Sequence, residues 1–365
     1  MQRAFPVAVM RGGSSRALVF RAEDLPAEIE LQDRVFMAAL GCPDPTGRQV
    51  DGLGGGASSN NKVAIVAPSD DPGADVDYTF CQLSPDHDAV DRAGNCGNIS
   101  AAIGPFAIET GIVVPEDGVT TVTIRNTNSG RRLVAHVPTP NRRFDPHGSF
   151  AIGGVPGTGA SISLDFVEPS GSAGRGELPS GRPAESLAGP DFGTVRCSLV
   201  DAGKPCVLVP FSEMGLNQDV RPEELDANPS MLSRIEALRG AGAVAMGLAA
   251  DSAATTPSLP QLAFFAPADR GALRVLGISM GRAHRSLPLT AAICLGAASG
   301  ISGTLVAGAL GSWSGGEKPL TLVHPAGRIE VSPSFAKGKD GPRLDRVSVA
   351  RTARRLFEGA VYVEI

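Results

Sequence analysis

The chain has 365 residues, of which 42% are hydrophobic and 19% charged, as expected of a soluble globular protein with room for two domains. Its formal net charge of −5 excludes a general basic surface for nucleic acid, and no apolar stretch approaches the roughly 20 residues of a membrane-spanning helix. The 45 glycines and 29 prolines, with only 5% aromatic residues, indicate many tight turns and favour a β-rich fold.

The first half of the chain combines short strands with two helices. Apolar or alternating residues predict strands at 5–10, 17–20, 63–66 and 75–82, and a strand pair within 119–137. Helical spacing of apolar residues predicts helices at 28–40 and 99–108. The second of these carries almost no charge, which is typical of a helix surrounded by protein. Between the first two strands, residues 11–15 read as a hairpin loop headed by Arg11.

The second half repeats this arrangement. Strands are predicted at 194–199, 206–209, 272–277 and 360–363, and helices at 222–238 and 287–298. We interpret the Gly-, Pro- and Ser-rich run 169–192 as an interdomain connection, and Glu358-Gly359 as a turn before the last strand. Each half thus places one nearly uncharged helix after a run of strands. We therefore expect two similar lobes, 1–185 and 186–354, with a C-terminal strand at about 355–365 that packs back on the first lobe.

The cysteines and histidines do not indicate a disulfide framework or a metal site. None of the six cysteines stands in a CxxC pair, so we expect reduced thiols and a cytoplasmic protein. The five histidines never stand at HxxH or HxxxH spacing, so no metal is expected. Five cysteines are interpreted as core thiols or as a turn residue without a chemical partner. These are Cys42, Cys81, Cys197, Cys206 and Cys294.

Cys96 differs from the other cysteines. It stands in the run Asn95-Cys96-Gly97-Asn98, at the predicted start of helix 99–108. Backbone N–H groups at a helix start are unpaired and carry partial positive charge, so they stabilise a thiolate and hold carboxylates. This placement predicts a thiolate that acts on an anionic substrate, whereas a small buried hydrophobe is the alternative.

The loop 52–62 (GLGGGASSNNK) superficially resembles a phosphate loop. It lacks the Gly-Lys-Ser/Thr signature, and Lys62 is followed by a strand instead of a helix, so no nucleotide cofactor is expected. The functional interpretation is a loop in which Ser58, Ser59 and Asn60 offer hydroxyl and amide donors to a substrate, with Lys62 pointing inward. The alternative is a flexible turn.

Arg11 and His284 also have two interpretations each. An arginine between a strand and two glycines suits bidentate capture of a carboxylate, although a solvated loop charge is the alternative for Arg11. His284 fits a structural role as well as a substrate-binding one.

Several motifs, in order along essentially the whole chain, resemble the PrpF family. They are 11–15 (RGGSS), 51–55 (DGLGG), 58–63 (SSNNKV), 91–102, His284, 287–290 (LPLT), 302–304 (SGT) and 351–354 (RTAR). The family contains 4-oxalomesaconate tautomerases, methylitaconate isomerases and aconitate-isomerising accessory proteins of the methylcitrate pathway. The resemblance implies the diaminopimelate-epimerase-like α+β fold. This fold has two lobes, each a barrel-like, mostly antiparallel sheet around a central helix, with the active site between the helix starts.

The resemblance also implies site residues. In the wider superfamily the first lobe carries a catalytic cysteine in a Cys-Gly-Asn motif, which Cys96-Gly97-Asn98 matches, and PrpF-like enzymes carry a lysine that Lys62 matches. The epimerases add a second cysteine at the other helix start, where this chain reads LPLT and has no thiol, so a two-thiol racemase is disfavoured. The candidate substrate-binding residues are Arg11, Ser14, Ser58, Ser59, Asn60, Asn95, Gly97, Asn98, His284 and Thr290.

These implications predict an isomerase that performs a 1,3-allylic proton shift on an unsaturated di- or tricarboxylate, without a cofactor or metal. 4-Oxalomesaconate is the first choice of substrate, and aconitate and methylitaconate are the others. Neither nucleic acid nor membrane is expected as a partner, and a homodimer is possible. Two alternatives stay open: an accessory protein that binds an aconitase-like dehydratase, and a cofactor-independent racemase or epimerase.

The sequence leaves the choice of base open. Deprotonation at pH 7 costs about 4–5 kcal/mol for a free lysine and about 2 kcal/mol for a free cysteine. On this comparison Cys96 is the base and the Lys62 ammonium is the acid or the partner of the dienolate. Burial in an apolar lobe would favour a neutral lysine and reverse the two roles.

Overall fold

The computed structural model describes residues 1–311, 316–317, 319–338 and 341–364. The chain divides into two compact units: Met1–Leu164 with Arg351–Ile365, and Asp165–Ala350. Ile365, the last residue of the predicted C-terminal strand, lies outside the described residues.

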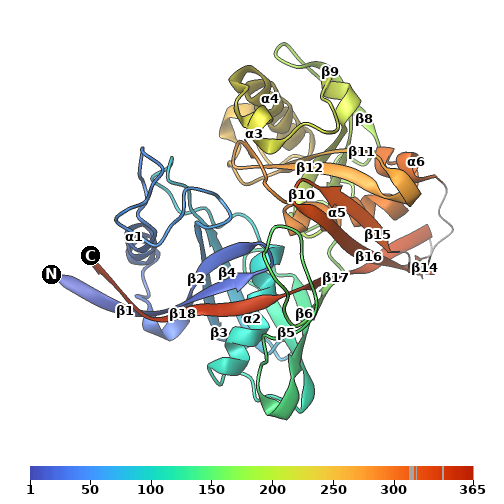
Figure 1. The fold of residues 1–365 in the computed structure, drawn as a ribbon. Coiled ribbons are helices and arrows are strands. Elements are labelled where there is room, and N and C mark those ends of the chain that lie inside the picture. Colours follow the sequence, from blue (N-terminus) through green and yellow to red (C-terminus); the bar gives the residue numbers. More distant parts are fainter. Residues whose placement is uncertain (312–315, 318, 339–340, 365) are drawn as a thin grey trace. The chain divides into compact units, whose positions relative to one another are not determined.

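The first unit is built on a mixed sheet in the order β18, β1, β2, β3, β4, β5, β6. Its strands are β1 (Gln2–Gly12), β2 (Ser15–Arg21), β3 (Lys62–Pro68), β4 (Val76–Gln82), β5 (Gly118–Asn126), β6 (Arg132–Thr139) and β18 (Ala353–Glu364). Neighbours pair antiparallel except for β2–β3 and β4–β5, which are parallel. The first and last strands of the chain therefore run side by side, blue and red in Figure 1. Strand β7 (Ile162–Val167) spans the division between the units.

Helix α2 (Gly97–Glu109) is the centre of the first unit. Strands β1, β2, β3, β5, β6 and β18 all contact it, and its residues 97–108 are buried. Small residues such as Ala101 and Gly104 let the strands approach closely, since a Cβ on Gly104 would lie 2.8 Å from Val137. The second helix of this unit, α1 (Ile29–Leu40), ends at Gly41, whose left-handed φ of 67° suits glycine.

The second unit repeats the same strand pattern, in the order β8, β9, β10, β11, β12, β15, β16. Its strands are β8 (Glu185–Gly189), β9 (Gly193–Asp201), β10 (Pro205–Pro210), β11 (Gln261–Pro267), β12 (Leu273–Ser279), β13 (Arg282–Ala283), β14 (Gly316–Glu317), β15 (Leu320–His324), β16 (Gly327–Gly338) and β17 (Gly341–Arg351). Parallel pairs again stand at the third and fifth junctions, β10–β11 and β12–β15. The two sheets thus share one topology.

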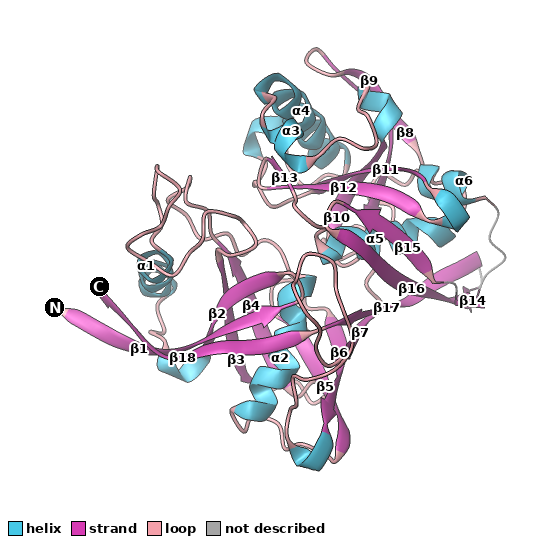
Figure 2. Ribbon diagram, in the orientation of Figure 1, coloured by secondary structure: helices cyan, strands magenta, loops and turns pink. Residues whose placement is uncertain are grey.

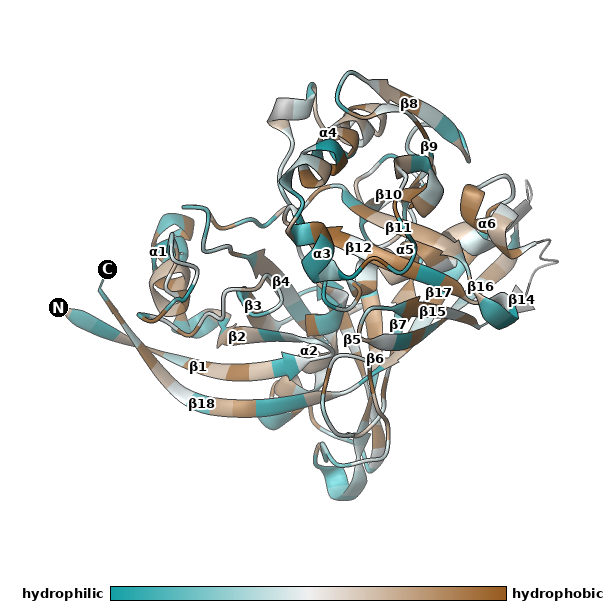
Figure 3. Ribbon diagram, turned by 45° about the horizontal axis from the view of Figure 1, so that its top comes forward, coloured by the Kyte–Doolittle hydropathy of each residue, from teal (hydrophilic) through white to brown (hydrophobic). Residues whose placement is uncertain are grey.

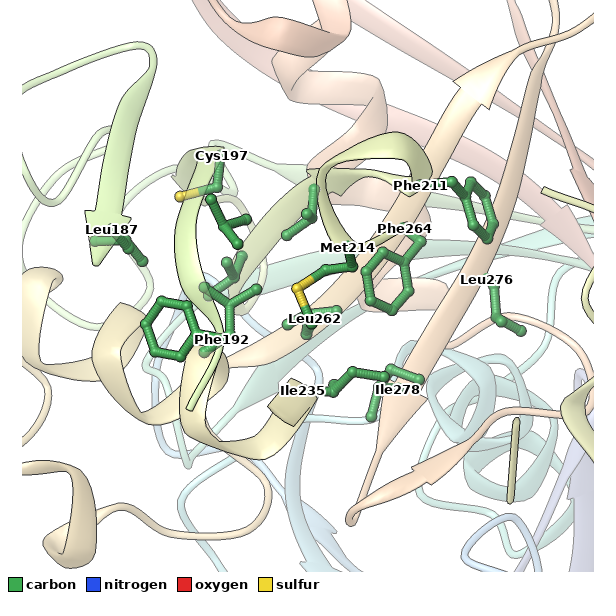
Figure 4. Close-up of a cluster of buried hydrophobic side chains, with 14 of the residues drawn as sticks. Leu187, Phe192, Cys197, Phe211, Met214, Ile235, Leu262, Phe264, Leu276 and Ile278 are labelled. Atoms are coloured by element: carbon green, nitrogen blue, oxygen red, sulfur yellow. The ribbon is translucent and has the colours of Figure 1, made fainter. Parts of the chain in front are cut away.

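Helix α5 (Leu289–Gly300) is the central helix of the second unit and corresponds to α2. It lies beside the strands of this unit (Figure 2) and contacts β9, β10, β11 and β16. Its residues are largely hydrophobic (Figure 3). Helices α3 (Pro222–Asp226) and α4 (Pro229–Ala245) follow β10 as α1 follows β2. A cluster that includes Phe264, Met214 and Ile235 joins α4 to the sheet (Figure 4). The remaining helices are α6 (Leu305–Leu310) and the 3-10 turns η1 (Ala22–Asp24), η2 (Pro140–Arg142), η3 (Phe211–Met214), η4 (Ser252–Ala254) and η5 (Asp269–Gly271).

Two units that each wrap a mixed sheet around one buried helix confirm the predicted α+β fold. Three local predictions differ from the structure. The helix expected at 222–238 is two helices, because Pro229 starts α4 after an Asn228 cap. No turn occurs at Glu358-Gly359: β18 continues through them and shifts register between Phe357 and Arg355.

The third difference concerns the run 169–192, which was expected to connect the domains after residue 185. In the structure the division falls after Leu164, and this run belongs to the second unit. Its backbone is bonded to the β9–β10 hairpin: Gly171 N donates to Asp201 O at 2.9 Å, and Gly203 N donates to Pro169 O at 2.7 Å. The Gly- and Pro-rich run 169–192 is therefore hydrogen-bonded to the β9–β10 hairpin of the second unit.

Candidate active site

Cys96 is the N-cap residue of α2, with extended backbone angles (φ −125°, ψ 99°). The amide of Ser100 donates to Cys96 O at 3.0 Å and its hydroxyl donates to the same oxygen at 3.1 Å, which fixes the first turn. Cys96 is partly exposed, whereas the other five cysteines are buried. Burial raises the pKa of Cys81 and of Cys197 to about 12. Cys96 is therefore the cysteine that combines partial exposure with a position at a helix start.

The β1–β2 hairpin packs directly on the start of α2. A Cβ on Gly12 would lie 2.5 Å from Asn98 O, and one on Gly13, whose φ is +52°, would lie 2.2 Å from Asn98 Oδ1. Asn98 Nδ2 donates to Ser14 Oγ at 3.3 Å, and Asn98 Oδ1 accepts from Arg351 Nε at 3.2 Å. The two glycines thus let the β1–β2 hairpin approach the start of α2 closely. The Asn98 side-chain amide then joins this helix start to Ser14 and Arg351 by hydrogen bonds.

Two arginines lie at this end of the first unit. Arg11 Nη1 donates to Thr352 O and Thr352 Oγ1, both at 2.9 Å, and to Gly13 O at 3.1 Å. Burial lowers the pKa of Arg11, and the neighbouring Arg354 lowers it further. Burial alone lowers the pKa of Arg351 to about 9. Positive charge therefore gathers beside the α2 start, which suits a polyanionic ligand.

Lys62 is the first residue of β3, and its side chain is held by β4. It is 8% exposed, its Nζ donates to Gln82 Oε1 at 2.5 Å, and it lies 5.2 Å from the centre of the Phe80 ring. Within the described parts of the chain, Gln82 is its one hydrogen-bond acceptor. An amide oxygen and an aromatic face both stabilise a cation, so this setting suits an ammonium group.

Strand β4 forms the surroundings of the Lys62 amine. Residues Tyr78, Phe80 and Gln82 alternate along β4 and so share one face. Phe80 and Gln82 contact Lys62, as described above. Farther along this face, burial raises the pKa of the Tyr78 phenol, and the Cys96 and Cys81 thiols raise it further. Lys62 therefore lies against the face of β4 that also carries Tyr78.

The Gly/Ser/Asn loop before β3 is held by two buried glutamines. Gln82 Nε2 donates to Ser58 O at 3.1 Å and to Asn61 O at 2.9 Å. Gln49 Nε2 donates to Asn61 Oδ1 at 2.5 Å, while Gln49 Oε1 accepts from Gly56 N at 2.7 Å. A flexible turn is therefore a poor description of this loop.

The remaining loop residues predicted to bind substrate use backbone groups within the protein. Ser59 O accepts from Arg16 N, and Asn60 N donates to Ala57 O, both at 2.9 Å. At the α2 start, Asn95 Oδ1 is buried and has no hydrogen-bond partner among the described residues. Contact of these residues with a substrate stays a prediction.

His284 and Thr290 belong to the second unit. His284 Nδ1 accepts from Ser286 N at 3.1 Å, and Thr290 Oγ1 donates to Gln261 Oε1 at 2.7 Å. Gln261 begins β11 as Lys62 begins β3, and Pro288 caps α5 as Cys96 caps α2. At the two positions that correspond to Lys62 and Cys96, the second unit therefore carries side chains that do not transfer protons.

Cys294, the thiol nearest the start of α5 in sequence, is inside that helix and fully buried. Its Sγ lies within hydrogen-bond distance of three backbone carbonyls, Lys204 O at 2.9 Å, Ala202 O at 3.2 Å and Val200 O at 3.7 Å. A core thiol is what the sequence predicted here. Of the two central helices, α2 is therefore the one that begins at a thiol.

The sequence did not single out Gln82 or Tyr78 as site residues, and it gave Arg351 only as part of the 351–354 motif. Gln82 and Tyr78 lie in a strand pattern that is typical of ordinary packing, and the hydrogen-bond partners of Gln82 and Arg351 are remote in sequence. The one local signal was a polar Gln82 at the end of the otherwise apolar Phe80-Cys81 stretch, opposite Lys62 in the β3–β4 register.

Solved structures show the same architecture. The crystal structure of methylitaconate-delta-isomerase matches with a TM-score of 0.78 and 36% identity, covering 100% of this chain and 96% of that one. A hydroxyproline epimerase from Agrobacterium vitis matches with a TM-score of 0.60 at 16% identity, covering 100% and 95%. The second likeness shows the fold alone. The protein therefore has the epimerase-like fold, with a thiol at one of its two central helix starts.

Sequence comparison identifies the family within this fold. The chain is 36% identical over 385 residues to 3-methylitaconate isomerase of Eubacterium barkeri, covering 100% of this chain and 98% of the relative. It is 36% identical over 359 residues to (4E)-oxalomesaconate Delta-isomerase of Novosphingobium sp. strain KA1, covering 98% and 97%. The family model of the PrpF protein matches residues 2–364, and the chain belongs to the PrpF family.

Proposed function

We propose that the protein is an isomerase that shifts the carbon–carbon double bond of an unsaturated di- or tricarboxylate. The observation that carries the proposal is the buried Lys62, whose amine is held by Gln82 beside the Phe80 ring, in the same unit as the partly exposed Cys96 at the α2 start. Relatives named for isomerisation of methylitaconate and oxalomesaconate support the reaction class, and their equal identity of 36% does not favour either substrate.

In the proposed reaction, Cys96 as thiolate accepts a proton from the sp³ carbon next to the double bond. The electron pair left behind spreads over the double bond and its conjugated carboxylate or carbonyl. Lys62 as ammonium stabilises this dienolate and gives a proton to the carbon two atoms away. The Gln82 oxygen and the Phe80 ring stabilise the cation that this role requires. The α2 amides at Gly97 and Asn98 would hold a substrate carboxylate.

A substrate panel tests the proposal. The protein is incubated in D₂O with 4-oxalomesaconate, our first choice, and separately with cis-aconitate, methylitaconate and L-proline. Ultraviolet absorbance follows the double bond, and NMR follows deuterium at carbon. We expect isomerisation and deuterium incorporation with at least one polycarboxylate and none with proline. Exchange of the proline α-proton alone would favour a racemase, and exchange of no substrate would favour a binding protein.

Two further parts of the proposal concern the protein as a whole. All six cysteines are unpaired, which agrees with a cytoplasmic location. Among the helices that the structure describes, none combines the length and apolar character needed to cross a membrane. A homodimer stays a prediction, which analytical ultracentrifugation would test.

A further inference from the structure

We propose that Gln82 is a positioning residue that fixes the Lys62 amine and couples it to the substrate-facing segment 58–61. The inference rests on the function proposed above and adds a residue that the sequence did not reveal. Gln82 is 5% exposed and stands directly opposite Lys62 in the β3–β4 register, so the two side chains share one face of the sheet.

The hydrogen bonds of Gln82 fix the orientation of its amide. Its Nε2 is surrounded by three carbonyl oxygens, Ser58 O at 3.1 Å and Asn61 O and Leu83 O at 2.9 Å. A rotated amide would set an oxygen against these three oxygens and an NH₂ group against the Lys62 ammonium. Both contacts would be repulsive, so Oε1 must face Nζ.

This geometry makes Gln82 a link between two parts of the site. One end of its amide holds the amine at 2.5 Å, and the other end holds the backbone of the segment that carries Ser58, Ser59 and Asn60. A lysine side chain has four rotatable bonds, so an unheld amine would sample many positions. Gln82 therefore sets where the proton donor lies relative to a substrate held by the loop.

Gln49 offers a matched control. It is also a buried glutamine, 2% exposed, whose amide bonds the same loop through Asn61 Oδ1 and Gly56 N. Its Nε2 also bonds Leu40 O and Cys42 Sγ, and among the described residues no lysine bonds it. Gln49→Met and Gln82→Met thus remove similar loop contacts, and only the second releases Lys62.

The test uses the full chain labelled with [ε-¹³C]lysine, in which Lys62→Arg assigns one of only five lysine signals. In Gln82→Met we expect the two Hε signals of Lys62 to merge, as in a mobile side chain. We also expect kcat to fall about 10- to 100-fold with a smaller change in KM. In Gln49→Met, which leaves the bond between Gln82 and Lys62 in place, the two signals should stay resolved.

The proposal is overturned if the two Hε signals of Lys62 stay resolved and kcat is unchanged in Gln82→Met, or if the two signals also merge in Gln49→Met. Should Gln82→Met fail to fold, Gln82→Glu keeps an acceptor oxygen opposite Nζ. Resolved Hε signals are then expected, and merged signals would contradict the inference. A wild-type protein without turnover would refute the proposed function, while the lysine signals would still decide whether Gln82 fixes Lys62.

Discussion

The close approach of Gly12 to the α2 start makes Gly12→Ala an informative perturbation. The added Cβ would lie 2.5 Å from Asn98 O, which is 0.9 Å inside the 3.4 Å where ordinary contact begins. The obstructing atom belongs to the backbone of a buried helix, so it cannot rotate away. Since Gly12 has no positive φ, the effect is steric alone, and the hairpin must move by about 1 Å relative to Cys96.

We expect Gly12→Ala to lower the free energy of unfolding by about 1–3 kcal/mol. A displacement of this size should also lower turnover per folded molecule by about 10- to 100-fold. Urea denaturation measures the first quantity, and deuterium incorporation into substrate measures the second. Gly308→Ala is the control: its Cβ meets nothing within 4 Å, and α6 should become equally or slightly more stable. Wild-type stability and turnover in Gly12→Ala would refute the reasoning.

Three further predictions follow from other parts of the molecule. Iodoacetamide under native conditions should modify Cys96 and leave the five buried thiols intact, as peptide mass spectrometry would show; modification of several thiols at similar rates would contradict this. The hydrogen bond from Arg125 holds the pKa of Asp77 below its ordinary value. The pair therefore stabilises the fold at a pH above the ordinary pKa of an aspartate, and this stabilisation is lost as the pH falls through the lowered pKa. Arg125→Met should therefore reduce stability at neutral pH and have little effect at a pH so low that Asp77 is protonated, and an equal effect under both conditions would contradict this account. Asn228→Ala removes the side-chain cap of α4 and should cost about 1 kcal/mol by urea denaturation, whereas an unchanged midpoint would show that the cap adds nothing.

Much of the fold was predictable because the two central helices have distinctive sequences. The segments that became α2 and α5 lack charged residues in their interiors, and strands flank them. The start of α2 at Cys96 also followed from local residues. The strand at Gln261–Pro267 was missed, however, because a short apolar run there has no periodicity that separates strand from helix.

The site was only partly predictable. Lys62 and Cys96 stand in recognisable loops, but Phe80 and Gln82, which surround the Lys62 amine, come from strand β4, and the sequence offered no reason to pair them with Lys62. The role expected for Arg11 was carboxylate capture, and the structure shows Nη1 engaged by Thr352 across 341 residues of sequence. Contacts between residues so far apart in the sequence depend on the register of the strands in the sheet, which a single sequence does not specify.

The most direct test of the central claim uses a substrate deuterated at its allylic carbon. Loss of deuterium and isomerisation are measured with Lys62→Met, Cys96→Ala and the control Cys81→Ala. If Cys96 is the base and Lys62 the acid, Cys96→Ala abolishes both loss of deuterium and isomerisation. Lys62→Met then still releases deuterium but isomerises at least about 100-fold more slowly, and Cys81→Ala resembles wild type. Loss of deuterium that persists in Cys96→Ala and disappears in Lys62→Met would reverse the two roles. Wild-type isomerisation in both Lys62→Met and Cys96→Ala would contradict the whole account.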